Sequence, residues 1–235
     1  NPNKLGEMIK IGRRGSLTGK LTILGIQGHV AYPHRANNPC TAITRILKEL
    51  KDLRFDQGTK DFQPTNLEIT SININNTADN VIPDSAYATF NVRFNDKHNS
   101  NSIKKIINKI LIKICNQTKT KYKIIYRVSG EAFITKPNRT VFMIQNIIQK
   151  VTKIKPRLST TGGTSDARFI RKIAPCLEFG LVNKTMHRVD ECVSLTDLRK
   201  LTKIYNDILI EYFKWNYTKL KNLKLIKMVC MQAVI

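Results

Sequence analysis

Two of the chain's four histidines lie in the short stretch QGHVAYPH, where they are His29 and His34. Histidine titrates near neutral pH and also binds zinc, so a catalytic role and a metal-binding role are both open. A local zinc motif is disfavoured, because the spacing is not that of a helical H-E-x-x-H pair and Pro33 would break a helix there. Any chemistry by these histidines needs partners from elsewhere in the fold or from another chain. The alternative is that both are structural.

A second candidate is the glycine-rich stretch STTGGTSDARF, which begins at Ser159. Gly162 and Gly163 would let backbone N–H groups approach an anionic ligand closely, and the neighbouring hydroxyls add donors. The stretch lacks the G-K-[ST] ending of a Walker A loop. Asp166 could cap the helix that follows. An ordinary polar loop with a helix cap is the alternative reading.

Other charged side chains could contact a substrate. Arg13, Arg14 and Arg93 could each hold a carboxylate bidentately, although each could equally be a solvated charge. His187 follows an expected strand in the stretch NKTMH, and a lone histidine of this kind is more often structural.

Taken in order, these stretches resemble the succinyl-diaminopimelate desuccinylases of the M20 zinc peptidase/deacylase family. They read IGRRGSL, QGHVAYPH, NVIP, STTGGTSDARF and NKTMH, and the resemblance covers about residues 4–213. It implies a catalytic α/β domain that carries a pair of zinc ions, and a ferredoxin-like lid that forms a homodimer. It also implies a small-molecule substrate, with hydrolysis of the N-succinyl amide of LL-diaminopimelate to succinate and LL-diaminopimelate.

The resemblance assigns roles by position. His187 corresponds to a zinc ligand, and His29 corresponds to the lid histidine that reaches the opposite subunit's site and stabilises the oxyanion. His34 keeps its structural reading. The positions that correspond to substrate-binding segments are Arg13, Asn80, Arg93, Ser159, Thr161, Gly162, Gly163 and Asn183.

The family's remaining zinc ligands and its general base have no counterpart in this sequence. A catalytic zinc needs about three protein ligands, so we expect no zinc pair to bind to this chain alone, and no activity from it. The sequence begins at Asn1 rather than at a methionine, which is typical of a fragment or a processed chain. Another M20 deacylase, similar to acetylornithine deacetylase, and a non-catalytic dimerisation remnant are the alternatives.

The elements that must position these residues follow from hydrophobic periodicity. Alternating stretches predict strands at 16–26, 65–74 and 121–130, and a further strand that follows a turn around Pro83 and ends at Phe94. Helical spacing predicts helices at 39–53 and 101–117. The resulting β-α-β-β-α-β order predicts a ferredoxin-like unit at residues 16–128. An RNA-binding RRM has the same order, so a basic nucleic-acid-binding module is a further alternative, although no RNP aromatic pattern is present.

The remaining segments predict part of an α/β layer, which gives an α/β fold class with an α+β lid. Residues 1–15 would end the first catalytic segment, and residues 129–213 would form the C-terminal one. In the latter we expect helices at 138–152 and 195–213 and a strand at 174–181. Residues 214–235 form a tail with no clear role.

The composition is strongly basic, with 40 Lys+Arg against 17 Asp+Glu and a formal net charge of +23. Such a charge favours polyanionic partners. The lysines are spread along the chain among many Ile and Asn residues, however, so compositional drift is a competing cause. We expect no specific nucleic-acid partner and no membrane partner. Five cysteines without a CxxC pair fit a reduced, cytoplasmic protein.

Overall fold

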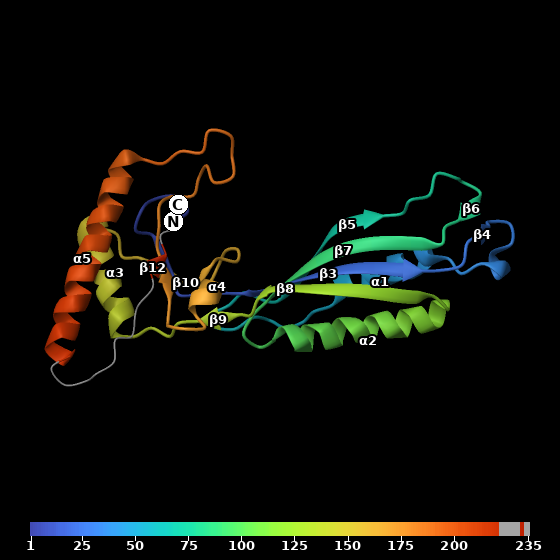
Figure 1. Ribbon diagram of the computed structural model, residues 1–235, viewed down its shortest axis with the longest axis horizontal. Coiled ribbons are helices and arrows are strands. Elements are labelled where there is room, and N and C mark those ends of the chain that lie inside the picture. Colours follow the sequence, from blue (N-terminus) through green and yellow to red (C-terminus); the bar gives the residue numbers. More distant parts are fainter. Residues whose placement is uncertain (221–230, 233–235) are drawn as a thin grey trace. The chain divides into compact units, whose positions relative to one another are not determined.

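The structure is a computed structural model that describes residues 1–220 and 231–232. The chain divides into two compact units (Figure 1). The inserted unit is Arg14–Ala132. The outer unit consists of Asn1–Arg13 together with the chain from Phe133 onward. The relative placement of the two units is not determined, so each is described by itself.

The inserted unit is a four-stranded antiparallel sheet with two helices on one face (Figure 1). The strands lie in the order β5-β7-β3-β8, which in chain order is second, third, first and fourth. This confirms the β-α-β-β-α-β prediction of a ferredoxin-like fold. The elements are β3 (Gly15–Leu24), α1 (Pro39–Asp52), β5 (Asn66–Asn73), β7 (Ser85–Phe94), α2 (Ser100–Thr118) and β8 (Lys121–Gly130).

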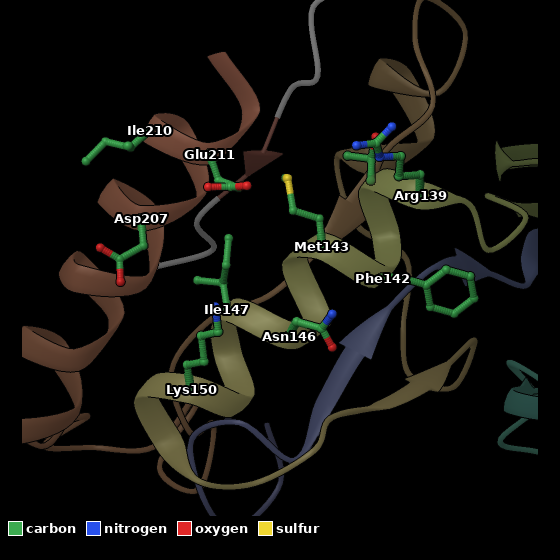
Figure 2. Close-up of a pocket in the computed structure, with 10 residues that line it drawn as sticks. Arg139, Phe142, Met143, Asn146, Ile147, Lys150, Asp207, Ile210 and Glu211 are labelled. Atoms are coloured by element: carbon green, nitrogen blue, oxygen red, sulfur yellow. The ribbon is translucent and has the colours of Figure 1, made fainter. Parts of the chain in front are cut away.

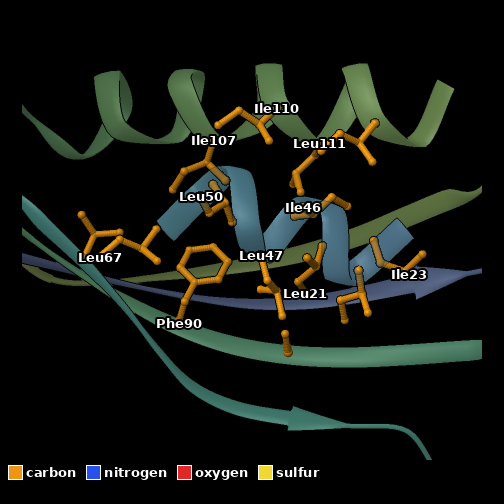
Figure 3. Close-up of a cluster of buried hydrophobic side chains, with 14 of the residues drawn as sticks. Leu21, Ile23, Ile46, Leu47, Leu50, Leu67, Phe90, Ile107, Ile110 and Leu111 are labelled. Atoms are coloured by element: carbon orange, nitrogen blue, oxygen red, sulfur yellow. The ribbon is translucent and has the colours of Figure 1, made fainter. Parts of the chain in front are cut away.

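Alternating residues of the strands supply the core of this unit (Figure 3). Leu21 and Ile23 of β3 face the same side as Phe90 of β7, and the helices add residues at helical spacing, such as Ile46 and Leu50 of α1. Gly19 of β3 pairs with Phe90, whose ring occupies the space that a Cβ would need. The glycine therefore makes room for the largest side chain at the centre of the sheet.

Asparagine residues begin three of the helices. The side chains of Asn38, Asn99 and Asn138 accept hydrogen bonds from backbone N–H groups in the first turns of α1, α2 and α3 (Arg139–Thr152). Each cap satisfies a donor that the helix itself leaves unpaired. At α2 the Ser102 side chain also accepts from the Asn99 N–H, which completes a capping box.

Short segments complete the inserted unit. β4 (Gly28–His29) pairs with β6 (Val81–Ile82), and a single 3₁₀ turn, η1 (Pro33–Arg35), follows β4. The strand predicted to reach Ile26 ends earlier, at Leu24. The reason is that the N–H of Gly25 donates to the carbonyl of Asp84 at 2.7 Å, and Ile26 forms an isolated bridge with Asn37.

The outer unit contains a small mixed sheet packed against α3 and α5 (Leu195–Leu220). β1 (Met8–Lys10) lies between β10 (Arg157–Ser159) and β11 (Leu177–Glu178), and β12 (Met231–Gln232) pairs with β11. A separate two-residue ladder joins β2 (Gly12–Arg13) to β9 (Phe133–Ile134). The remaining helix is α4 (Ala167–Ile170).

Three expectations for the outer unit need correction. The strand expected at 174–181 is only two residues long, because Pro175 cannot donate to a ladder and the chain turns away at Gly180. Helix α5 continues past residue 213 to Leu220, so the expected tail begins inside a helix, and most of that tail lies outside the described residues. Asp166 occupies the N-cap position of α4, but its side chain makes no capping hydrogen bond because its backbone is already helical.

None of the helices in the described part of the chain is both long and apolar enough to span a membrane.

The loop between α1 and β5 is organised by Asp56, whose side chain is only 5% exposed. Its carboxylate accepts hydrogen bonds from the Asn95 side chain and the Gly58 N–H, both at 2.6 Å, and from the Thr65 N–H at 3.3 Å. Burial raises the pKa of this carboxyl, but the hydrogen bonds from Thr65, Gly58 and Asn95 outweigh burial, so the pKa is lowered below 3.8. The resulting stabilisation is present above that value and is lost as the pH falls through the lower pKa of the folded state.

We expect Asp56→Asn to lower the free energy of unfolding at pH 7 by about 2–3 kcal/mol, because an amide nitrogen would face donors that now meet a charged acceptor. Urea unfolding measures this change. The matched control is Asp52→Asn, which removes an exposed pair with Lys48 and should leave the stability nearly unchanged. Equal losses in the two variants would contradict the role given to Asp56.

Candidate functional site

Four of the predicted site residues lie in one cluster of the outer unit. Nη1 of Arg13, on β2, donates to the carbonyl of Thr161 at 3.1 Å. The hydroxyls of Ser159 and Thr161 lie 2.9 Å apart. Gly162 lies so close to Arg13 that an added Cβ would stand 2.5 Å from Nη1. The sequence motifs GRR and STTGG therefore meet in the fold.

Gly162 has a backbone conformation that only glycine adopts easily, with a φ of +104°. A side chain there would be strained and would displace the Arg13 guanidinium. Gly163 has no heavy atom within 4 Å of the position where a Cβ would be added, so it is not sterically required. Of the two glycines, only Gly162 shapes the contact with Arg13.

Lys10, on β1, also belongs to this cluster. Its Nζ donates to the Thr161 hydroxyl at 2.6 Å and lies 3.4 Å from the Ser159 hydroxyl. Burial lowers the pKa of Lys10 to about 8, and the positive charge of Arg13 lowers it further, whereas Glu178 acts in the opposite direction. Lys10 therefore changes charge close to neutral pH while it remains bound to the loop.

Glu178, on β11, is the buried acid of the cluster, and its side chain is 6% exposed. Its Oε2 accepts a hydrogen bond from Nε of Arg13 at 2.7 Å. Its other oxygen, Oε1, is buried and has no hydrogen-bond partner among the described residues. The carboxylate thus binds Arg13 through one atom only.

Neither Lys10 nor Glu178 was predicted from the sequence. Each is a charged residue within a short apolar strand, in MIKI and CLEF. Charged residues are rarely buried without a partner, so such a position is itself a signal of a buried pair.

Asn183 and His187 lie in a separate exposed turn of the outer unit. Thr185 closes this turn, because its hydroxyl exchanges hydrogen bonds with the backbone of Cys192 at 2.9 and 3.1 Å. His187 has a φ of +63°, and its N–H donates to the Glu191 carboxylate at 3.3 Å. Among the described residues, no hydrogen bond or ion pair joins either side chain to the Arg13 cluster.

The described residues do not form a metal centre by themselves. No group of three or more His, Cys, Asp and Glu side chains in this part of the chain could hold an ion. Among the residues that the structure describes, the one acidic side chain hydrogen-bonded to His187 is Glu191, and it accepts from the His187 backbone N–H rather than from the imidazole. The donor set present here therefore does not fit a zinc pair.

In the inserted unit, the structure brings His29 and Asn80 together. β4 pairs with β6, and the N–H of Val30 donates to the carbonyl of Asn80 at 3.0 Å. Nδ1 of His29 accepts a hydrogen bond from the N–H of Ala31 at 3.0 Å. A neutral imidazole with this contact carries its proton on Nε2, and because His29 is exposed, this proton can be donated to a ligand.

Arg93 lies on β7, between Ser16 of β3 and Asn66 of β5. Nη1 of the neighbouring Arg14 donates to Asn66 Oδ1 at 2.8 Å. Burial lowers the pKa of Arg14, and the positive charge of Arg93 lowers it further. Arg14 thus contacts Asn66, the residue that pairs with Arg93 across the sheet, and two cations in this region suit an anion.

An open pocket of about 800 Å³ lies elsewhere in the outer unit, between α3 and α5 (Figure 2). Its walls include Phe142 and Met143 of α3 and Glu211 of α5. None of the predicted site residues lines it. This pocket and the cluster of polar residues around Arg13 are thus different places.

We expect Gly162→Ala to lower the free energy of unfolding by about 1–2 kcal/mol, because alanine is strained at positive φ. It should also shift the NMR signal of the Arg13 Nε–H group. Gly163→Ala is the control and should change stability by less than about 0.5 kcal/mol. A Gly162→Ala protein with an unchanged Arg13 signal would contradict the close contact.

We expect Lys10 to titrate near pH 8 in the folded chain. NMR of ¹³C-labelled lysine would follow its Cε signal, and Lys10→Arg would identify that signal by its disappearance. Binding of a small carboxylate to this cluster should weaken as the pH rises through 8, because Lys10 loses its positive charge. A titration near the ordinary lysine value of 10.5 would contradict the burial of Lys10.

A family model described as "Peptidase dimerisation domain" (M20_dimer) matches residues 11–119. The chain is 71% identical over 213 residues to a succinyl-diaminopimelate desuccinylase of Pelagibacter ubique, and the match covers 91% of this chain and 56% of the relative. A desuccinylase of Paracoccus denitrificans is 48% identical over the same shares. The chain spans about half the length of the curated relatives that it matches.

Solved structures show the same fold. A tripeptidase from Staphylococcus aureus superimposes with a TM-score of 0.73 at 17% identity, covering 88% of this chain and 54% of the other. An M20 family metallo-carboxypeptidase from Sulfolobus solfataricus superimposes with a TM-score of 0.65 at 16% identity, covering 86% and 59%. The chain therefore carries the M20 peptidase dimerisation domain and, over most of its length, resembles the succinyl-diaminopimelate desuccinylases.

Proposed function

We propose that this chain is the lid and C-terminal catalytic segment of a zinc-dependent succinyl-diaminopimelate desuccinylase of the cytoplasm. The reaction is hydrolysis of N-succinyl-LL-diaminopimelate to succinate and LL-diaminopimelate, which serves lysine and diaminopimelate biosynthesis. The observation that carries the proposal is the 71% identity to the Pelagibacter ubique desuccinylase over 91% of this chain.

The proposal divides the chain by role. Residues 16–128 form the lid, and residues 1–15 and 129–213 belong to the catalytic domain. The lid pairs with a second copy to give a homodimer, as the dimerisation-domain match suggests. The sheet of the inserted unit supports this, because β5 and β8 are edge strands whose free backbone groups can pair with another chain. Ile125 of β8 is 70% exposed, which adds apolar surface at that edge.

The cationic clusters bind the carboxylates of the substrate. In the outer unit this role falls to Arg13 and Lys10, with hydrogen bonds from the Thr161 segment. In the inserted unit it falls to Arg93, beside Arg14. The other residues assigned to substrate binding are Asn80, Ser159, Gly162, Gly163 and Asn183. A substrate with several carboxylates needs several such contacts, and guanidinium groups hold carboxylates bidentately.

His29 donates the Nε2 proton to the oxyanion that develops on the amide carbonyl. Its Nδ1 is occupied by the Ala31 N–H, so the tautomer is already set for this task. A fixed donor aimed at developing charge stabilises the transition state more than the substrate. By resemblance, His29 acts at the site of the opposite subunit.

His187 is one zinc ligand, and the other ligands come from outside this chain. We expect no zinc pair and no hydrolytic activity from this chain alone, because the family's other zinc ligands and its general base have no counterpart in the sequence and a catalytic zinc needs about three protein ligands. A chimera that adds the unmatched part of the Pelagibacter ubique relative to this chain should regain activity.

The first test compares this chain with the chimera. With added zinc, the chain alone should not hydrolyse N-succinyl-LL-diaminopimelate above a zinc-only blank, whereas the chimera should. The chimera should be much less active on N-acetylornithine, the substrate expected if this is a different M20 deacylase. Turnover by the chain alone, or a preference for acetylornithine, would contradict the proposal.

The second test uses the chimera to locate the action of His29. His29→Ala should lower the rate by ~10²–10³ through loss of an oxyanion donor, and His187→Ala should abolish activity. Mixed heterodimers should recover activity at one of their two sites, because the His187→Ala subunit lends its intact His29 to the other subunit. His34→Ala is the control and should remain active. No recovery in heterodimers verified by mass would exclude action across subunits.

The basic nucleic-acid-binding alternative is not favoured. Base stacking on an RRM-like sheet needs exposed aromatic residues on the central strands. On the open face, β3 presents Thr18 and Lys20 and β7 presents Thr89 and Asn91, with Tyr87 as the single aromatic residue of these two strands on that face.

A further inference from the structure

We propose that Glu178 is a positioning residue that fixes the direction of the Arg13 guanidinium toward the substrate carboxylate. This inference rests on the proposed function, because it assigns a task to Arg13. The proposal gives a role to an acid that no substrate contact requires and that the sequence motifs do not include.

The contact geometry carries the inference. Arg13 has three groups of donors: Nε, Nη1 and Nη2. Glu178 takes Nε at 2.7 Å, and the Thr161 carbonyl takes one hydrogen of Nη1 at 3.1 Å. Among the described residues, Nη2 makes no hydrogen bond. The end of the guanidinium formed by Nη1 and Nη2 therefore keeps free donors, in the parallel arrangement that binds a carboxylate.

If both oxygens of Glu178 bound Arg13, one would accept from Nε and the other from Nη2, and Nη2 would have fewer donors left for a substrate. Glu178 does not bind Arg13 in this way, because its Oε1 is buried and makes no hydrogen bond among the described residues. Leaving a buried carboxylate oxygen unpaired costs free energy, so the one-point contact is not the arrangement of lowest energy for the pair alone. The arrangement leaves Arg13 oriented and still able to bind a second carboxylate.

Charge supports the same role. Lys10 and Arg13 are both partly buried in this cluster, and Glu178 is the acid that offsets them. Without Glu178, the two cations would repel each other, and Arg13 could turn toward solvent. The backbone of Glu178 pairs directly with that of Lys10 across the β1–β11 ladder, so the acid is held at a fixed place between them.

The experiment uses the full 235-residue chain and two substitutions. Glu178→Gln keeps an oxygen acceptor for Nε of Arg13 but removes the charge. Glu178→Ala removes both. Glu211→Gln, an exposed acid on α5 in the same unit, is the matched control for loss of charge. NMR follows hydrogen exchange at the Arg13 Nε–H and the titration of Lys10, and calorimetry follows binding of succinate as the carboxylate probe.

We expect slow exchange at the Arg13 Nε–H in the wild type and in Glu178→Gln, and fast exchange in Glu178→Ala. The pKa of Lys10 should fall below about 8 in Glu178→Gln but not in Glu211→Gln, which a purely structural role would not produce. Succinate should bind on the order of tenfold more weakly to Glu178→Ala, whereas Glu178→Gln should bind it as tightly as the wild type or more tightly.

Two results would overturn the inference. One is an unchanged Arg13 Nε–H in Glu178→Ala. The other is succinate binding to Glu178→Ala as tight as to Glu178→Gln, because loss of the negative charge alone should strengthen anion binding. If Glu178→Ala does not fold, exchange at the Arg13 Nε–H in the wild type and in Glu178→Gln decides, and fast exchange in both would contradict the contact. If the wild type binds no succinate, the proposed substrate class fails, and the Arg13 exchange rate still decides the role of Glu178.

Discussion

An insertion within a domain requires that its two ends meet, and in this chain they meet in a ladder of only two residue pairs. Gly12 pairs with Ile134, and Arg13 pairs with Phe133. The approach is close, because the Phe133 carbonyl occupies the space that a Cβ on Gly12 would need. The same ladder fixes the backbone of Arg13, whose side chain reaches Glu178 and the Thr161 carbonyl. The point at which the chain leaves the outer unit is therefore also the point that builds the cationic cluster.

The parts of the fold that were predicted correctly are those whose signal is local. Alternation along β3 and β7 and helical spacing in α1 and α2 reflect burial of one face, and neighbouring residues alone reveal it. The predicted ends of strands were less accurate where a backbone group far away in the sequence determines the end. The N–H of Gly25, for example, donates to the carbonyl of Asp84, and β3 ends at the residue before it. The short β11 shows the same effect, because Pro175 and Gly180 outweigh an apolar stretch.

The candidate site shows a similar division. The motifs named Arg13, Thr161 and Gly162 as functional, and the structure brings them into contact. The acid that holds Arg13 is 165 positions away, so no spacing rule could join them. A lysine in an apolar strand gives no local sign of an altered pKa, because that change comes from burial and from a neighbouring guanidinium. The roles of His29, Asn183 and His187 still rest on resemblance.

The order of the strands in the inserted unit has a consequence for synthesis of the protein. β3 is made first but lies between β7 and β8, and its pairing with β8 joins residues roughly a hundred positions apart. Non-local pairing of this kind is slow, because a long loop must close before any contact is gained. A ribosome that has delivered β3, α1 and β5 has therefore produced two strands that cannot yet join, because β7 lies between them in the sheet, and α2 is not yet present to complete the core around Leu21 and Ile23. Until β7 and β8 emerge, this nascent chain presents the sort of apolar surface that chaperones bind.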